Sequence, residues 1–135
     1  MILFIDDEDE MESFELGLKL SEYEYQVKRV TNVDDAWEYL NCNEVQIKLI
    51  IMDIMIPPGD LFNDVDTKGG LRTGLDLLEK IREKNNSLPV IVFSNVSDQK
   101  IISHFQRQPK CLFLRKEEEG AFTLPHKVHQ LLKDS

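Results

Sequence analysis

The chain has 135 residues, 41% of them hydrophobic, and its 25 acidic and 16 basic side chains leave a formal net charge of −9. This length suits one domain, residues 1–135, with an ordinary hydrophobic core, which excludes a disordered chain and a disulfide scaffold. Because no apolar run approaches a bilayer span, no export signal is recognisable and the surface is acidic, we expect a soluble cytoplasmic protein that binds neither membranes nor nucleic acid directly.

Short apolar runs alternate along the chain with segments of helical period, a pattern typical of a parallel sheet that is covered by helices on both faces. Residues 2–5 form the first predicted strand. The next segment predicts a helix, because its apolar residues recur at the 3.6-residue period. This apolar face comprises Met11, Phe14 and Leu18, with Leu16 and Leu20 beside it.

The middle of the chain repeats this alternation. Residues 25–30 predict a second strand, and Asn32 can cap a helix that ends near Asn41 by accepting a bond from a backbone N–H. Residues 47–52 are almost entirely apolar, as expected for a central strand that is buried on both faces. A polar, glycine-rich stretch follows at about residues 58–72, which we expect to form an inserted loop.

Two further strands complete the predicted sheet. Apolar residues resume helical spacing from Leu75 onward, and residues 89–93 then predict the fourth strand. Residues 98–107 form a polar predicted helix, residues 112–114 form the fifth strand, and Thr123 opens a last helix. The five pairs of strand and helix predict a doubly wound α/β fold, in which ligands bind outside the carboxyl ends of the strands.

Four of the predicted strands are followed by polar side chains. Asp6 and Asp7 follow the first strand, Asp53 the third and Ser94 the fourth, and Lys116 stands just beyond the fifth. Because the carboxyl ends of parallel strands lie at one edge of a sheet, we expect these side chains to converge. Three carboxylates with one ammonium remain anionic, and hard carboxylate oxygens with no His or Cys beside them indicate Mg²⁺ or Mn²⁺.

This group of residue types suits phosphoryl chemistry. Asp53 would attack a phosphorus atom as a carboxylate nucleophile and form an acyl phosphate. The metal and Lys116 would offset the charge on the phosphoryl oxygens, and Ser94 would donate a hydrogen bond to one of them.

Four motifs resemble those of the receiver domains of two-component response regulators. They are Ile-Asp-Asp-Glu (5–8), Ile-Met-Asp-Ile-Met-Ile-Pro (51–57), Val-Ile-Val-Phe-Ser (90–94) and Phe-Leu-Arg-Lys (113–116), and the resemblance covers essentially the whole chain. Each motif alone is weak, but four in the right order are specific. The resemblance implies a flavodoxin-like, five-stranded parallel sheet of order 2-1-3-4-5. It also implies phosphorylation of an aspartate by a sensor histidine kinase or a phosphotransfer protein.

The resemblance assigns roles to the acidic residues. Asp53 would be the phosphoacceptor. Asp6, Asp7, Asp53 and the backbone carbonyl of Met55 would hold Mg²⁺, with Asp6 acting through water. The protein would catalyse only its own phosphorylation and dephosphorylation, and its output would pass to a downstream protein target rather than to a fused effector.

The resemblance also implies a switch. Ser94 and Lys116 would bind the phosphoryl group, and Phe113 occupies the family's aromatic switch position, although a core role fits it equally well. The switching face would comprise the fourth helix, the fifth strand and the fifth helix. Two residues depart from the family pattern: Asn95 replaces a small residue, where it could crowd the water that hydrolyses the acyl phosphate, and Glu117 replaces a proline.

Other functions fit the residues less well. An aspartate-based phosphatase would need a second acid where Met55 stands, and a flavodoxin-type cofactor site would need a Ser/Thr-rich loop where residues 6–10 are all acidic. The serious alternative is a receiver-like protein interaction module that works without phosphorylation. Asn95, Glu117 and the predicted loop at 58–72 support that alternative.

Overall fold

A five-stranded parallel β-sheet forms the centre of the computed structural model, which describes residues 1–8, 11–42, 46–54, 56 and 73–133. The strand order is β2-β1-β3-β4-β5, which confirms the predicted topology. The strands are β1 (Ile2–Ile5), β2 (Val27–Val30), β3 (Leu49–Met52), β4 (Val90–Ser94) and β5 (Cys111–Arg115). The helices are α1 (Glu12–Leu20), α2 (Val33–Cys42), α3 (Thr73–Lys84), α4 (Gln99–Gln106) and α5 (Thr123–Lys133), and a 3₁₀ turn, η3 (Lys116–Glu118), follows β5.

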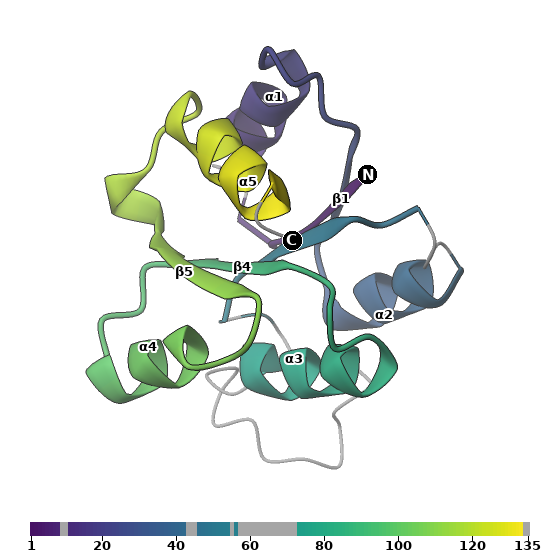
Figure 1. Ribbon diagram of the computed structural model, residues 1–135, viewed down its shortest axis with the longest axis vertical. Coiled ribbons are helices and arrows are strands. Elements are labelled where there is room, and N and C mark those ends of the chain that lie inside the picture. The colour runs from purple at the N-terminus through teal and green to yellow at the C-terminus, as the bar shows by residue number, and fades with distance from the viewer. Residues whose placement is uncertain (9–10, 43–45, 55, 57–72, 134–135) are drawn as a thin grey trace.

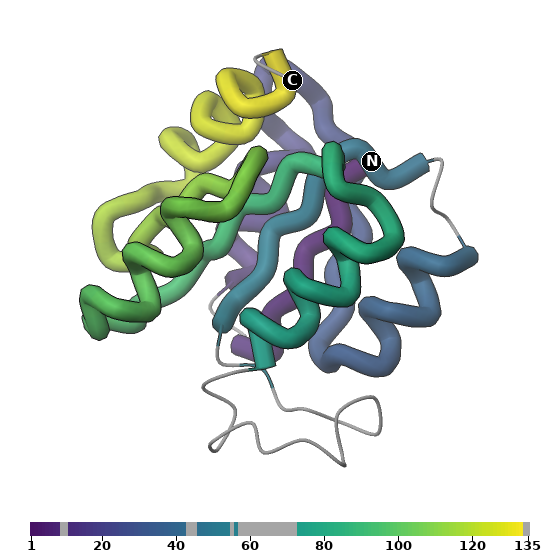
Figure 2. The backbone as a smooth tube through the Cα atoms, turned by 60° about the horizontal axis from the view of Figure 1, so that its bottom comes forward, coloured from purple at the N-terminus to yellow at the C-terminus, as the bar shows by residue number. Residues whose placement is uncertain are grey.

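Helices cover both faces of the sheet (Figure 1). Successive side chains of a strand point to opposite faces, so each central strand contributes to two cores. Ile2 and Phe4 of β1 belong to the core that α1 and α5 cover, together with Leu18 and Val128. Leu3 belongs to the other core, which α2, α3 and α4 cover. Figure 2 shows α3 and α4 lying next to each other across that second face.

The described elements follow the predicted order but differ in length. β2 and β3 begin at Val27 and Leu49, later than the predicted residues 25 and 47. The predicted cap on α2 is confirmed, because the Asn32 Oδ1 accepts a hydrogen bond from the Asp35 backbone N–H at 2.8 Å. The predicted loop at 58–72 lies outside the described residues. Within the described part of the chain, no helix has both the length and the apolar composition to span a membrane.

The amino ends of β4 and β5 are held by one guanidinium. Arg82, near the end of α3, donates from Nη1 to the Leu88 carbonyl at 2.6 Å, just before β4. Its Nη2 donates to the carbonyls of Pro109 and Lys110 at 2.8 and 3.2 Å, just before β5. Hydrogen bonds from a charged donor are among the stronger ones in proteins, so Arg82 ties a helix to two strands.

We expect replacement of Arg82 by Met to destabilise the fold by about 3 kcal/mol, because several charge-assisted hydrogen bonds are lost and their carbonyls are left without this donor. Urea unfolding monitored by circular dichroism measures the change. Arg107→Met is the matched control, because Arg107 is exposed at the end of α4 and should cost less than about 0.5 kcal/mol. Equal losses in the two variants would contradict this role of Arg82.

Candidate functional site

The sheet places two aspartates side by side at its carboxyl edge. Ile5 of β1 pairs with Met52 of β3, so Asp6 and Asp53 each follow directly after a paired residue. The Asp53 N–H donates to the Ile5 carbonyl at 3.2 Å, which extends the ladder to the phosphoacceptor candidate. Both side chains are almost fully buried, Asp6 with 1% and Asp53 with 4% of its surface exposed.

Lys116 reaches these aspartates from the end of β5, the strand at one edge of the sheet. Arg115, the last residue of β5, pairs with Ser94 of β4, and Lys116 follows it. The Lys116 Nζ lies 2.7 Å from the Asp53 Oδ2 and 2.8 Å from the Asp6 Oδ2. Three residues that are far apart in the sequence therefore meet at one point, as the sequence predicts.

Glu8 belongs to the same cluster, although no pattern in the sequence predicts a role for it. Its Oε1 lies 3.1 Å from the Lys116 Nζ. Its backbone N–H donates to the Asp6 Oδ1 at 2.9 Å, and its carbonyl accepts a hydrogen bond from the Arg29 guanidinium. The acidic run at residues 6–10 is the signal that could have pointed to it, but the run does not show which side chain contacts the lysine.

Burial and the neighbouring charges shift the pKa values of Asp6 and Lys116. Burial raises the pKa of Asp6 above its ordinary value, hydrogen bonds from Lys116 and from the Glu8 backbone oppose this, and the Asp53 charge adds to it. Burial alone would lower the pKa of Lys116, but its hydrogen bonds to Asp53 and Asp6 outweigh burial and raise that pKa. Lys116 therefore remains an ammonium, and it offsets one of three carboxylate charges.

The remaining negative charge and the oxygen donors suit a hard divalent cation. Ligand oxygens of Asp6, Glu8 and Asp53 all lie within 4.8 Å of one another. Carboxylate oxygens are what Mg²⁺ prefers, and this ion usually keeps several waters besides a few protein ligands. Asp7, a predicted ligand, is exposed, and Met55 lies outside the described residues. The donor set of Asp6, Glu8 and Asp53 thus fits Mg²⁺, and the ligand roles of Asp7 and Met55 stay predictions.

The phosphoryl-binding and switch candidates lie on β4 and β5. Ser94 is buried at the end of β4, and its Oγ accepts a hydrogen bond from the Val96 N–H at 3.4 Å. Phe113 of β5 is half-buried and packs against the core that α2, α3 and α4 cover. Asn95 is exposed, and its Oδ1 accepts a hydrogen bond from the Glu117 N–H at 3.1 Å.

Gly74 allows α3 to begin directly against the segment that carries Asp53. Its N–H donates to the Ile54 carbonyl at 3.0 Å. A Cβ at this position would lie 2.6 Å from the Ile54 Cα and 3.2 Å from the Asp53 carbonyl oxygen. Any side chain at position 74 would therefore displace the backbone that carries Asp53.

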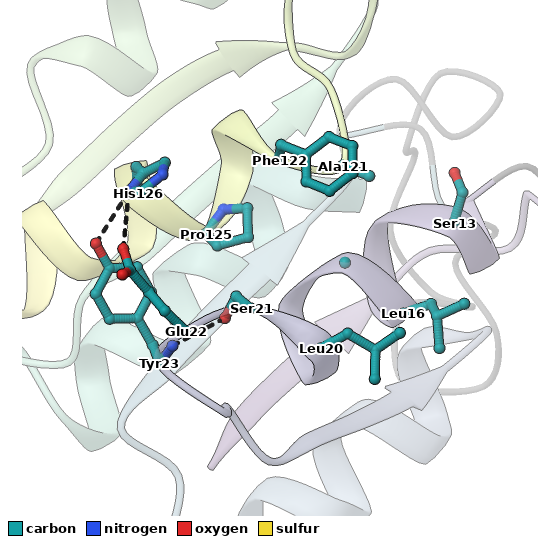
Figure 3. A pocket seen from close by; sticks show the side chains of 11 residues that line it. Ser13, Leu16, Leu20, Ser21, Glu22, Tyr23, Ala121, Phe122, Pro125 and His126 are labelled. Atoms are coloured by element: carbon teal, nitrogen blue, oxygen red, sulfur yellow. Dashed lines mark hydrogen bonds and ion pairs between the residues drawn. The ribbon is translucent and has the colours of Figure 1, made fainter.

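A second surface, the α1–α5 groove, lies between α1 and the start of α5 (Figure 3). This groove has a volume of about 500 Å³ and is mainly apolar. The large hydrophobic side chains that are most exposed in the described part of the chain, Leu16, Leu20 and Phe122, all line it. One end is closed by His126, whose Nδ1 lies 2.9 Å from the Tyr23 hydroxyl oxygen. Leu16 and Leu20, which the periodicity placed beside the apolar face of α1, thus remain exposed to solvent.

Comparison with known proteins identifies the family. The model of the response regulator receiver domain matches residues 2–121. The chain is 31% identical over 97 residues to the response regulator RppA of Synechocystis and 28% identical over 97 residues to the 3′,5′-cyclic-nucleotide phosphodiesterase regA of Dictyostelium discoideum. These matches cover 72% and 70% of this chain but only 36% and 11% of the two relatives.

Solved structures show the same fold. The receiver domain of NtrX from Brucella abortus is 24% identical, with all of both chains covered and a TM-score of 0.73. A two-component response regulator from Clostridium difficile is 21% identical, with 98% of this chain and 94% of that chain covered and a TM-score of 0.75. At these identities the likeness establishes the flavodoxin-like fold alone. Together with the family match over residues 2–121, it shows that this chain belongs to the response regulator receiver domain family of two-component signalling.

Proposed function

We propose that this receiver domain accepts one phosphoryl group on Asp53 from a phosphohistidine of a sensor kinase or phosphotransfer protein, and that it signals to a downstream protein target in the cytoplasm. The observation that supports the proposal best is the contact between a buried carboxylate and an ammonium. Asp53 and the Lys116 Nζ lie 2.7 Å apart at the carboxyl edge of the sheet, where ligands of such folds bind.

The chemistry follows from the charges around Asp53. A carboxylate oxygen of Asp53 attacks phosphorus, an O–P bond forms, and the P–N bond to the donor histidine breaks with its electron pair going to the imidazole. Lys116 offsets charge on the phosphoryl oxygens, and the Ser94 hydroxyl donates a hydrogen bond to one of them. Asp53 thereby loses its carboxylate charge, and Lys116 then pairs with the negatively charged phosphoryl group instead.

Mg²⁺ is the proposed cofactor. Asp6, Glu8 and Asp53 would hold it, and the sequence adds Asp7 and the backbone carbonyl of Met55 as further ligands. When bound, the ion would neutralise charge on the phosphoryl group and orient it.

We expect Mg²⁺ at ten times its dissociation constant to raise the free energy of unfolding by about 1.4 kcal/mol. Urea unfolding with and without the ion measures this. The stabilisation should disappear in Asp53→Asn and persist in Asp34→Asn, a control on α2. Comparison of Glu8→Gln with Asp7→Asn shows which of these carboxylates contributes more to the affinity. A Mg²⁺ response that survives Asp53→Asn unchanged would contradict the proposed site.

The proposed switch involves Ser94 and Phe113. A hollow of about 340 Å³ opens between α4, β5 and the start of α5, and Phe113 lines it together with Ile102 and Lys127. Phe113 therefore has free space beside it and a core behind it, which suits a side chain that changes its packing when Ser94 moves toward a phosphoryl oxygen. The face formed by α4, β5 and α5 is the proposed output surface.

Incubation with acetyl phosphate and Mg²⁺, followed by intact-protein mass spectrometry, tests the function. We expect the mass of one phosphoryl group to be added and to be lost again on incubation. If no such mass is added and no Mg²⁺ response is found, the phosphorylation proposal fails.

A phosphorylation-independent interaction module is the second candidate. The α1–α5 groove favours it, because Phe122 has 88% of its surface exposed and Leu20 has 76% exposed. Glu22 lines the groove, and Glu12 and Glu15 lie in the first turn of α1. This combination would suit a partner helix that has an apolar face with basic flanks.

A further inference from the structure

The two positions that depart from the family pattern contact each other. The Asn95 Oδ1 accepts a hydrogen bond from the backbone N–H of Glu117 at 3.1 Å. These residues are 22 positions apart in the sequence, and they belong to the loops that follow β4 and β5. The contact therefore joins the segment that carries Ser94 to the segment that carries Lys116.

The Glu117 N–H needs a partner from outside its own segment. Glu117 lies in the first turn of η3, where backbone N–H groups have no acceptor within the turn. Arg115, which precedes η3, makes no side-chain capping hydrogen bond. Asn95 supplies the acceptor instead. Asn95 stands one position beyond Ser94, and Glu117 stands two positions beyond Arg115, the residues that form the last pair of the β4–β5 ladder. The Asn95 side chain thus extends the pairing of these strands by one contact.

Lys116 lies between two anchored backbone positions. On one side is Arg115, paired within the sheet, and on the other is Glu117, held by Asn95. The ion pair of the ammonium with Asp53 cannot serve as the lasting anchor, because the proposed reaction changes the charge of Asp53. The ion pair between the Arg115 Nη2 and the Glu117 Oε1, at 3.2 Å, joins only the end of β5 to η3, the turn that follows it, and makes no link to β4.

We propose that Asn95 is a positioning residue for phosphoryl uptake. Through the Glu117 N–H it fixes the backbone around Lys116, so that the ammonium stays near Asp53 while its ion pair with that residue changes. The inference rests on the proposed function, and it assigns to Asn95 a role different from crowding of the hydrolytic water. A proline at position 117 has no N–H and would make this contact impossible, so the contact depends on both departures.

Three variants at position 95 separate positioning from crowding. Asn95→Leu keeps the size of the side chain and removes the acceptor, Asn95→Asp keeps the acceptor, and Asn95→Ala removes both. The exposure of Asn95 means that these variants should keep the fold, which thermal unfolding checks. The readouts are the rate of phosphoryl uptake from acetyl phosphate with Mg²⁺ and amide hydrogen exchange across residues 116–118.

We expect phosphoryl uptake to slow in the variants that lack a hydrogen-bond acceptor at position 95. Asn95→Leu and Asn95→Ala should both slow uptake about five-fold and accelerate exchange at Glu117 by a similar factor, as removal of one hydrogen bond predicts. Asn95→Asp should stay within about two-fold of the wild type, because its carboxylate still accepts from the Glu117 N–H. Wild-type uptake in Asn95→Leu would overturn the proposal, since crowding alone depends on side-chain size.

A double-variant cycle supplies the second test. Glu117→Pro removes the N–H, so the addition of Asn95→Leu to it should cause no further slowing. A further slowing as large as in the wild-type background would overturn the proposal. Glu117→Ala is the matched control, because it removes the side chain but keeps the N–H. Hydrogen exchange can be measured without phosphoryl transfer. If the protein is never phosphorylated but Asn95→Leu still accelerates exchange at Glu117, the proposed function is refuted while the contact itself is established.

Discussion

Replacement of Asp53 by Asn is expected to abolish phosphoryl uptake from acetyl phosphate while it leaves the fold intact. The amide is nearly the same size as the carboxylate but is not nucleophilic, so no acyl phosphate can form. Lys116 keeps its ion pairs with Asp6 and Glu8 in this variant, at 2.8 and 3.1 Å in the wild type, so the buried ammonium is not left alone. Intact-protein mass spectrometry after incubation with Mg²⁺ measures the effect.

Two comparisons make this result specific. Asp34→Asn carries the same chemical change on α2 and should be labelled like the wild type. Circular dichroism should show that Asp53→Asn unfolds at a temperature no lower than that of the wild type, because one of the mutually repelling carboxylates has been removed. Labelling of Asp53→Asn at the wild-type rate would show that another residue accepts the phosphoryl group.

Replacement of Lys116 by Met is expected to have the largest effect on stability, a loss of about 3–5 kcal/mol near neutral pH. The Lys116 side chain is only 4% exposed, and its ammonium pairs with carboxylates of Asp6 and Asp53 that are about as deeply buried. Without it these carboxylates remain close together with their charges uncompensated. Chemical unfolding of the two proteins at the same pH gives the difference.

The pH dependence of Lys116→Met tests the cause. Burial already raises the pKa of Asp6 in the wild type, and the loss of the ammonium removes the main influence that opposes this shift. A carboxyl group with a raised folded-state pKa binds more protons in the native state, so stability falls as pH rises through that pKa and recovers at lower pH. We therefore expect Lys116→Met to be less destabilised at pH about 5 than at pH about 7.

A second substitution should restore part of the lost stability. Asp53→Asn in the Lys116→Met background removes one of the uncompensated charges, so the double variant should be more stable than Lys116→Met alone. A loss in Lys116→Met that is independent of pH and unaffected by Asp53→Asn would indicate that packing of the lysine stem, rather than its charge, is what matters.

The convergence of Asp6, Asp53 and Lys116 could be predicted because it depends on topology. Each follows a strand, and a parallel sheet brings the carboxyl ends of its strands to one edge whatever the details of the loops. The sheet order could be predicted only through the family motifs, since alternation of strands and helices is compatible with more than one order.

The rest of the site depends on local geometry that a pattern does not carry. Glu8 contacts the Lys116 ammonium although 44% of its side chain is exposed, and this contact depends on a loop held by the Glu8 backbone contacts with Asp6 and Arg29. The contact between Asn95 and Glu117 joins two segments that are 22 positions apart, so it could not be predicted from either residue alone. The exposure of Leu16 could not be read from helical period, because an apolar side chain at the margin of a buried face can face either way.

The guanidinium of Arg82 has a consequence for how this domain can move. Its acceptors are neutral carbonyls before β4 and β5. These hydrogen bonds therefore do not change when charge is added at the opposite end of the sheet. The amino ends of the two strands are therefore anchored by contacts that do not depend on the charge at Asp53. Displacement of β5 by an added phosphate should therefore be smallest at Cys111, the strand residue next to this anchor.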